Sequence, residues 1–271
     1  MTDAARDVAA REDDERVGLA ATNAQRGFWL LIAIGVLVFV LLASIAIGSK
    51  DIPLPTVIDA LFNYNDSDDH AIIMALRVPR TVLGLGVGIA LGLSGALIQA
   101  LTRNPLADPG ILGVNAGASF FVTLAVGLFG FTSISSYIWF AFLGAILATV
   151  LVYAIGSVGR GAATPIRLTL AGVAISAVLS GVQSGLELLN PATFDAMRFW
   201  RAGSLTAPGY DNIVVAAPFL AIGLVLAIVA TRPLNAIALG DDLAASLGAN
   251  ITRTRVTVVI SVTLLAGAAT A

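Results

Sequence analysis

The chain has 271 residues, of which 58% are hydrophobic and only 12% are charged, and its formal net charge at pH 7 is −2. Soluble domains carry roughly 25% charged residues, so this composition excludes an ordinary water-soluble domain and indicates a membrane protein. The sequence has no cysteine, which excludes disulfides, thiol catalysis and cysteine-bound metals. Because nearly all ionisable residues lie between apolar stretches, we expect no nucleic-acid partner.

Residues 1–27 are predicted to be a disordered cytoplasmic tail. Four arginines are mixed there with six acidic residues. A secretory signal peptide has instead a basic start, a short apolar core and a cleavage site of small residues. We therefore expect the first apolar stretch to remain in the membrane as an anchor, and residues 28–271 to form one transmembrane domain.

Seven apolar stretches follow, and their lengths predict membrane-spanning helices. About 20 apolar residues cross the hydrocarbon core, and only a helix pairs its own backbone groups where lipid cannot. The seventh stretch has 16 residues before the sequence ends, so we expect a truncated sequence, with a short tilted or interfacial helix as the alternative. The fold class is an all-α polytopic membrane bundle. The predicted spans are 28–48, 81–101, 111–130, 137–158, 168–190, 211–231 and 256–271.

The positive charges predict the orientation of these spans. With the N-terminus inside, the inner segments hold ten arginines and the outer segments hold five positive residues. Cytoplasmic loops carry the excess of positive charge, so the N-terminus is expected in the cytoplasm and the protein in the cell membrane. The inner segments are 1–27, 102–110, 159–167 and 231–255, and the outer positive residues are Lys50, Arg77, Arg80, Arg198 and Arg201.

A strip of glycines marks the second span. Gly84, Gly88 and Gly92 recur at four-residue spacing, so they share one face of a helix. In lipid, helices associate through close backbone approach, which small residues permit. We predict that this strip packs against another helix, with a sliding surface in a moving bundle as the alternative.

The fifth span carries the best candidate for a transport pathway. Ser176, Ser180, Ser184 and Glu187 fall at spacings of four, four and three on an otherwise apolar helix, and Gln183 lies beside them. Polar groups at membrane depth usually face a bundle interior or a wet cavity. We predict that these residues line a water-filled pathway, and small-residue packing is the alternative.

The inner loop at 231–255 is too long for a simple connector. Asp241 is a candidate N-cap for a short helix, and Gly248 is a candidate left-handed stop. An earlier apolar turn ends at Gly240. We predict two short helices that form a docking knob on the inner face, with an interfacial hairpin as the alternative.

The sequence shows no catalytic set of residues. The only histidine, His70, follows Asp66, Asp68 and Asp69 in an outer loop, where we expect a solvated acidic tip rather than a cation site. The only lysine, Lys50, lies in no phosphate-binding loop motif. We therefore expect a transport protein that is not an enzyme, has no cofactor and takes its energy from another protein. An ion-coupled secondary transporter remains the alternative, because backbone and serine oxygens can hold sodium.

Several motifs occur in a fixed order along the chain. They are Leu76-Arg77-Val78-Pro79-Arg80, Gly95-Ala96-Leu97-Ile98-Gln99-Ala100, Asn104-Pro105-Leu106-Ala107-Asp108-Pro109, Leu112-Gly113-Val114, Leu170-Ala171-Gly172-Val173-Ala174, and Arg232-Pro233-Leu234-Asn235 with Ala238-Leu239-Gly240, Ala244 and Leu247-Gly248. From about residue 28 onward the chain therefore resembles the FecCD-type permease subunits of ABC importers for iron–siderophores, haem and cobalamin. Members of that family continue into a further glycine-rich segment and reach about ten helices.

The resemblance implies a function and a set of partners. The chain would form the permease that carries a ferric siderophore, or haem or cobalamin, across the membrane. Its implied partners are an ATP-binding cassette ATPase subunit, an extracytoplasmic substrate-binding protein, a second permease subunit that is identical or related, and membrane lipid.

The resemblance also implies roles for particular residues. Arg77 and Arg80 would pair with acidic groups of the binding protein, with lipid headgroup anchoring as the alternative, and Arg198 and Arg201 are further candidates for the same surface. The loop at 231–255 would fit a groove on the ATPase. The implied coupling residues are Leu239, Gly240, Asp241, Ala244, Leu247 and Gly248.

Overall fold

The computed structural model describes residues 23–131, 133–158, 165–203, 205, 210–246 and 248–270. Over these ranges the regular structure is entirely helical, which confirms the predicted all-α class. Most of the predicted tail, 1–27, lies outside the described residues. Six described helices are long and apolar enough to span a membrane, and a seventh, α6 (Val114–Phe129), is shorter.

Several helices differ from the sequence-based expectation. The last helix, α12 (Ile251–Thr270), has 20 residues rather than 16, because it begins before Arg253 and Arg255 and includes them. Helix α10 (Asp211–Ala238) continues well beyond the predicted end at 231 and has Pro233 inside it. A short helix that the sequence did not predict, α9 (Pro191–Ala202), follows directly after α8 (Pro165–Leu189).

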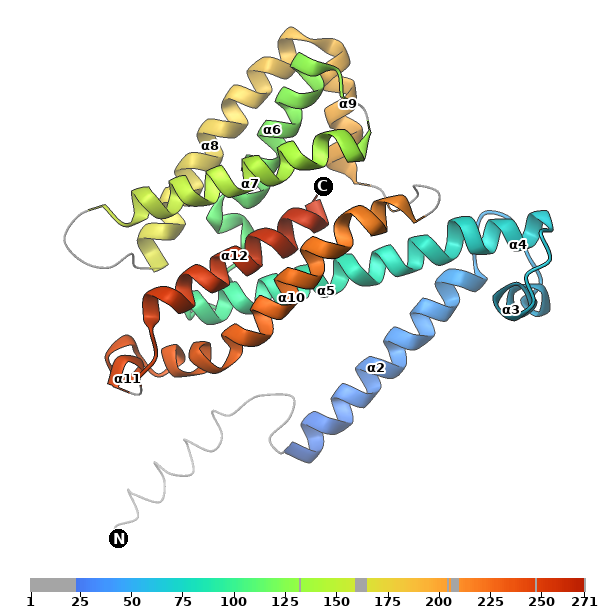
Figure 1. Ribbon diagram of the computed structural model, residues 1–271, viewed down its shortest axis with the longest axis horizontal. Coiled ribbons are helices and arrows are strands. Elements are labelled where there is room, and N and C mark those ends of the chain that lie inside the picture. Colours follow the sequence, from blue (N-terminus) through green and yellow to red (C-terminus); the bar gives the residue numbers. More distant parts are fainter. Residues whose placement is uncertain are drawn as a thin grey trace, which may run out of the picture. The chain divides into compact units, whose positions relative to one another are not determined.

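The chain forms two compact units, residues 1–81 and 82–271. The first contains α2 (Asn23–Ala46), α3 (Leu54–Phe62), α4 (Asp68–Ile72), the π-helix η1 (Ile73–Arg77) and the first residues of α5 (Val78–Thr102) (Figure 1). Helix α2 has no buried residue, although it is the most continuously apolar stretch, as suits a helix that faces lipid. The small core of the unit lies between α3 and η1, at Ile52, Val57, Ala60 and Ile73.

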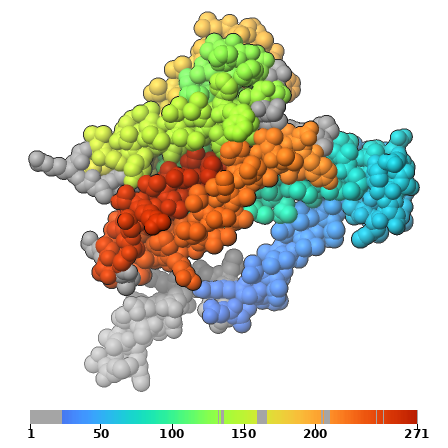
Figure 2. Space-filling view, in the orientation of Figure 1, coloured from blue at the N-terminus to red at the C-terminus, as the bar shows by residue number. Residues whose placement is uncertain are grey.

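The second unit contains the rest of α5, the 3-10 helix η2 (Pro109–Leu112), α6, α7 (Ile134–Gly156), α8, α9, α10, α11 (Asp241–Ser246) and α12. Helices α6 and α7 pack most extensively against each other, and so do α10 and α12, which lie side by side in orange and red in Figure 2. Helix α12 also packs against α7. The core therefore runs through both helix pairs and includes Val122, Ala145, Ala227 and Val262.

Glycines hold the closest helix contacts of this unit. A β-carbon on Gly117 of α6 would overlap the carbonyl oxygen of Gly144 in α7, and the reverse holds for Gly144. A β-carbon on Gly172 of α8 would overlap the carbonyl oxygen of Ile111. In α10, the carbonyl oxygen of Gly223 accepts a hydrogen bond of 2.7 Å from the Ser261 hydroxyl of α12. Because lipid-like surroundings give apolar helices little reason to associate, such backbone contacts set the packing.

The predicted glycine strip of α5 is not one of these contacts. A β-carbon on Gly88 or Gly92 would meet no heavy atom of the described residues within 4 Å. One on Gly84 would lie 3.3 Å from Leu205 Cδ1. Within the part of the chain that the structure describes, Gly88 and Gly92 thus contact no other helix, and the packing role of this strip stays a prediction.

Gly117→Ala should destabilise the subunit, because its methyl group would push α6 away from α7. Such overpacking costs about 1–3 kcal/mol of unfolding free energy. Gly88→Ala is the matched control, since its methyl group has open space and alanine favours a helix. The midpoint of thermal unfolding in detergent measures both. Equal midpoints for the two variants would contradict the packing described here.

Candidate functional site

Arg77 lies at the end of η1 and is almost fully buried, with 3% of its surface exposed. Its guanidinium donates to the carbonyl oxygens of Ile45 at 3.0 Å, Ala46 at 2.6 Å and Lys50 at 2.5 Å. Helix α2 ends at Ala46, and the last carbonyl groups of a helix have no partner within it. Arg77 supplies that partner. Arg77 therefore closes the C-terminal end of α2, and its burial does not favour the docking role implied by the resemblance, which stays a prediction.

Arg80 has a different environment three residues later. Its side chain is half-buried, and its Nε has no hydrogen-bond partner among the described residues. The neighbouring Thr81 is fully engaged, because its hydroxyl bonds to the Arg77 carbonyl at 2.9 Å and to the Ser44 hydroxyl at 2.8 Å. Of the two arginines in this motif, Arg80 is therefore the more accessible.

Helix α9 carries the other two predicted docking residues, and they differ as well. Arg198 is 61% exposed on its side chain, lies 3.5 Å from the Asp195 carboxylate and stands over the Phe199 ring at 5.1 Å. Arg201 is about half-exposed and forms an ion pair with Glu187 of α8. One predicted docking residue thus pairs with one predicted pathway residue.

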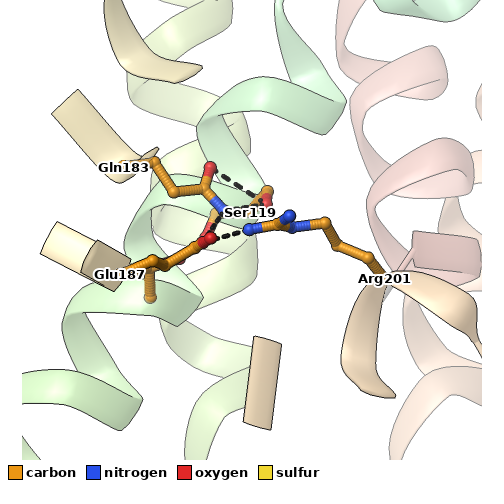
Figure 3. Close-up of polar contacts among 5 residues, drawn as sticks. Ser119, Gln183, Glu187 and Arg201 are labelled. Atoms are coloured by element: carbon orange, nitrogen blue, oxygen red, sulfur yellow. Dashed lines mark hydrogen bonds and ion pairs between the residues drawn. The ribbon is translucent and has the colours of Figure 1, made fainter. Parts of the chain in front are cut away.

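Glu187 and Arg201 belong to a polar cluster, together with Gln183 of α8 and Ser119 of α6 (Figure 3). The Gln183 amide nitrogen donates to the Glu187 carboxylate at 2.9 Å and to the Ser119 hydroxyl at 2.8 Å. Glu187 is only 4% exposed, and a buried carboxylate is costly unless it is paired. The Glu187 cluster therefore joins α6, α8 and α9 through hydrogen bonds and one ion pair.

The cluster corrects part of the predicted pathway. Gln183 and Glu187 do not face open space, because both are buried against α6 and α9. Ser180 and Ser184 are exposed, and Ser176 is half-buried. The two groups lie on adjacent faces of α8, since neighbouring residues are about 100° apart on a helix. The pathway prediction stays a prediction for the exposed serines. No sequence pattern indicated that Ser119 contacts Gln183.

The predicted docking knob has one short helix rather than two. Leu234 and Ile237 are buried parts of α10, which ends at Ala238, so the apolar turn before Gly240 is no separate helix. Helix α11 follows, and it ends as predicted. Gly248 has a φ of 81°, its N–H bonds to the Ala245 carbonyl at 3.0 Å, and the Ala249 N–H bonds to the Ala244 carbonyl at 2.9 Å. These two hydrogen bonds form a Schellman motif, which ends the helix; we call it the Schellman stop.

Individual coupling residues have distinct positions around α11. Leu239 and Leu243 are 64% and 48% exposed, whereas Ala244 is fully buried. Gly240 has a φ of 116°, a conformation that favours glycine and turns the chain between α10 and α11. Leu247 lies outside the described residues. The exposed leucines form an apolar tip on this end of the unit.

Asp241 does not cap α11 as predicted. It is the first residue of the helix, and its carboxylate points to two arginines instead. Arg103, just after α5, approaches Oδ1 at 2.6 Å, and Arg255 of α12 approaches Oδ2 at 2.7 Å. Arg103 also donates to the carbonyl oxygen of Ile237. Two segments predicted to be inner loops, 102–110 and 231–255, therefore meet at one end of the unit.

The outer loop is more ordered than expected around His70. Only 2% of this residue is exposed, and its Nδ1 accepts a hydrogen bond of 3.3 Å from the Asn65 N–H. Its Nε2 lies 3.6 Å from the Asp59 carboxylate. The expected solvated tip is wrong at this residue, because it packs inward. The described residues contain no group of three or more potential His, Cys, Asp or Glu metal ligands.

Comparison with known proteins places these features in a family. Residues 36–271 match the model of the FecCD transport family. The ferric enterobactin transport system permease of Escherichia coli K12 is 46% identical, over 88% of this chain and 72% of that protein. A siderophore transport permease of Bacillus subtilis 168 is 37% identical over 87% and 72%, and the hemin transport system permease of Yersinia pestis is 32% identical over 86% and 71%.

A solved structure supports the same assignment at the level of the fold. It is described as an inward-facing conformation of a metal-chelate type ABC transporter, and it superposes with a TM-score of 0.74 at 26% identity. The match covers 89% of this chain and 75% of that one. The family model and the similar permeases span the helices and the inner end described above. The chain belongs to the FecCD transport family.

Proposed function

We propose that this chain is the transmembrane permease subunit of an ABC importer that carries a ferric siderophore. The observation that carries the proposal is the 46% identity to a ferric enterobactin permease over 88% of the chain. Haem, the cargo in the name of one relative, is the first alternative cargo, and cobalamin is the second. The function requires a separate source of energy, because the permease moves cargo without hydrolysing ATP itself.

The inner end of the second unit is the proposed contact with an ATP-binding cassette ATPase. The apolar tip formed by Leu239 and Leu243 is exposed and lies next to Gly240, which sets the turn into α11. Apolar side chains on a short, well-stopped helix suit insertion into a groove of a partner. The coupling element is therefore α11 with its flanking turns, a smaller segment than the predicted loop 231–255.

The orientation follows from the same end of the molecule. Arg103, Arg253 and Arg255 lie on the segments beside α11, which agrees with an inner face rich in positive charge. The N-terminus is then cytoplasmic. A second copy of the permease, or a related one, and the surrounding lipid would cover the apolar surfaces that the single chain leaves exposed.

The end of the second unit that carries α9 is the proposed docking surface for a substrate-binding protein. Arg198 is its exposed candidate, and Arg201 is shared with Glu187, whereas Arg80 is a separate, half-buried candidate in the first unit. Exposed arginines steer an acidic partner and fix its register more than they add affinity. The exposed face of α8 that carries Ser180 and Ser184 is the proposed part of the cargo pathway.

The complete permease, reconstituted in vesicles with its ATPase and binding protein, should take up ferric enterobactin only when ATP is supplied on the ATPase side. The control vesicles contain the permease without the ATPase. Uptake that needs a sodium or proton gradient and no ATP would identify an ion-coupled secondary transporter instead. Radiolabelled iron retained in the vesicles provides the measurement.

Arg198→Glu should slow association of the substrate-binding protein with the permease by about tenfold at low salt, and the effect should shrink as salt is added. Arg253→Glu, an exposed arginine on the inner segment, is the matched control and should leave the association rate unchanged. Surface-bound binding protein with permease in detergent gives both rates. Equal rates for the two variants at every salt concentration would contradict the docking surface.

A further inference from the structure

Asp241 is the centre of an ion-pair group that none of the roles above requires. One carboxylate receives two guanidinium groups, from Arg103 at 2.6 Å and from Arg255 at 2.7 Å, each on its own oxygen. We call these three residues the Asp241 clamp. Charge-assisted pairs on separate oxygens fix the direction of the carboxylate as well as its position. The clamp thus sets where the first turn of α11 stands.

The clamp connects three elements that are far apart in the sequence. Asp241 begins α11, Arg103 follows the last residue of α5, and Arg255 lies in the first turns of α12. Arg103 also donates to the Ile237 carbonyl in the last turn of α10. The clamp and this hydrogen bond therefore link the end of α5 to α10, α11 and α12.

The backbone at Arg103 is held in an uncommon conformation. Its φ is 52°, in the left-handed region that residues other than glycine rarely adopt. The following Asn104 N–H bonds to the Gln99 carbonyl at 3.2 Å, which closes the end of α5 around this residue. Such strain persists only where the surroundings fix it, and here the guanidinium is fixed by Asp241 and Ile237.

The Arg103–Asp241 pair of the clamp is expected to add little to the stability of the fold. Arg103 and Asp241 are each 41% exposed on their side chains, and ion pairs of that exposure add little to stability. Helix α11 is already held by its Schellman stop and by the fully buried Ala244. The clamp therefore mainly sets the position of α11, the segment that would meet the ATPase, and contributes less to the stability of the fold.

Helix α12, which carries Arg255 of the clamp, is well placed to transmit motion. Arg255 is only 13% exposed on its side chain. Further along α12, Val258, Val262 and Leu265 are buried in the main core, and the Ser261 hydroxyl bonds to the Gly223 carbonyl of α10 at 2.7 Å. A displacement of the start of α12 must move this packed helix as a body, since close-packed interiors transmit strain.

We propose that the Asp241 clamp is a positioning device that transmits movement of α11, driven by the ATPase, to α12 and to the end of α5. The inference rests on the proposed function. It assigns Asp241 a role inside the permease, toward Arg103 and Arg255, rather than in contact with the ATPase. Loss of the clamp leaves the ATPase bound and active, but its hydrolysis no longer moves the helices of the pathway efficiently.

The test uses Asp241→Asn in the complete reconstituted complex, because asparagine keeps the shape of the side chain and removes its charge. The affinity for the ATPase should stay within about twofold, and the amount of ferric enterobactin taken up per ATP hydrolysed should fall about fivefold or more. Arg255→Gln should reproduce the loss. Arg253→Gln, which removes an exposed arginine two residues earlier, is the matched control and should retain the wild-type ratio.

A double variant keeps the test decisive if one substitution has other effects. Residues that act as a unit are not additive, so Asp241→Asn combined with Arg255→Gln should be no worse than either alone. Asp241→Glu should recover part of the ratio. An unchanged ratio in Asp241→Asn, or a loss that follows weaker ATPase binding, would overturn the clamp proposal. Failure of ATP-driven uptake in the wild-type complex would instead overturn the proposed function.

Discussion

At the crossing of α6 and α7, the carbonyl oxygens of Gly117 and Gly144 occupy the space that a β-carbon on the opposite residue would need. This contact fixes the distance between the two helices, and α6 and α7 in turn support α8, α9 and α12. The constraint matters because apolar helices gain little by associating in lipid, so packing depends on how closely two backbones can approach. The positions of α8 and α9 at the Glu187 cluster depend on it.

Hydrogen bonds and ion pairs of buried ionisable groups also hold the helices in place. Arg77 donates hydrogen bonds to the carbonyl oxygens at the end of α2, and Glu187 is paired with Arg201, so each buried charge has polar partners. Removing one partner of a buried pair strands the other charge, which is far more costly than the pair is beneficial. This explains why two residues that look like free functional groups in the sequence have structural partners. Arg80, Arg198 and the exposed serines of α8 remain the candidates for contact with partners and cargo.

Much of the fold could be predicted from the sequence, because apolar length alone identifies a membrane helix. Helix α9 could not, since it has 12 residues and a polar face. The glycine strip of α5 has the stronger pattern, yet Gly117 and Gly144 make the close contact, because a contact depends on both helices and a pattern describes only one. For the same reason the partners of Arg77, Glu187 and Asp241 could not be identified from the spacing of residues in the sequence. The Schellman stop at Gly248 could be predicted, because it depends only on neighbouring residues.

The proposed function is that of a gate, which nucleotide binding on another subunit moves. Because the chain has no cysteine, Ser180→Cys introduces a single thiol on the exposed face of α8, and Ser94→Cys, at a fully buried position, reports any unfolding. The direct measurement is the rate at which a membrane-impermeant thiol reagent modifies Ser180→Cys in the assembled importer, with and without ATP. The account predicts a clear change of rate on ATP addition while Ser94→Cys stays unmodified. Identical rates for Ser180→Cys in both conditions would contradict it.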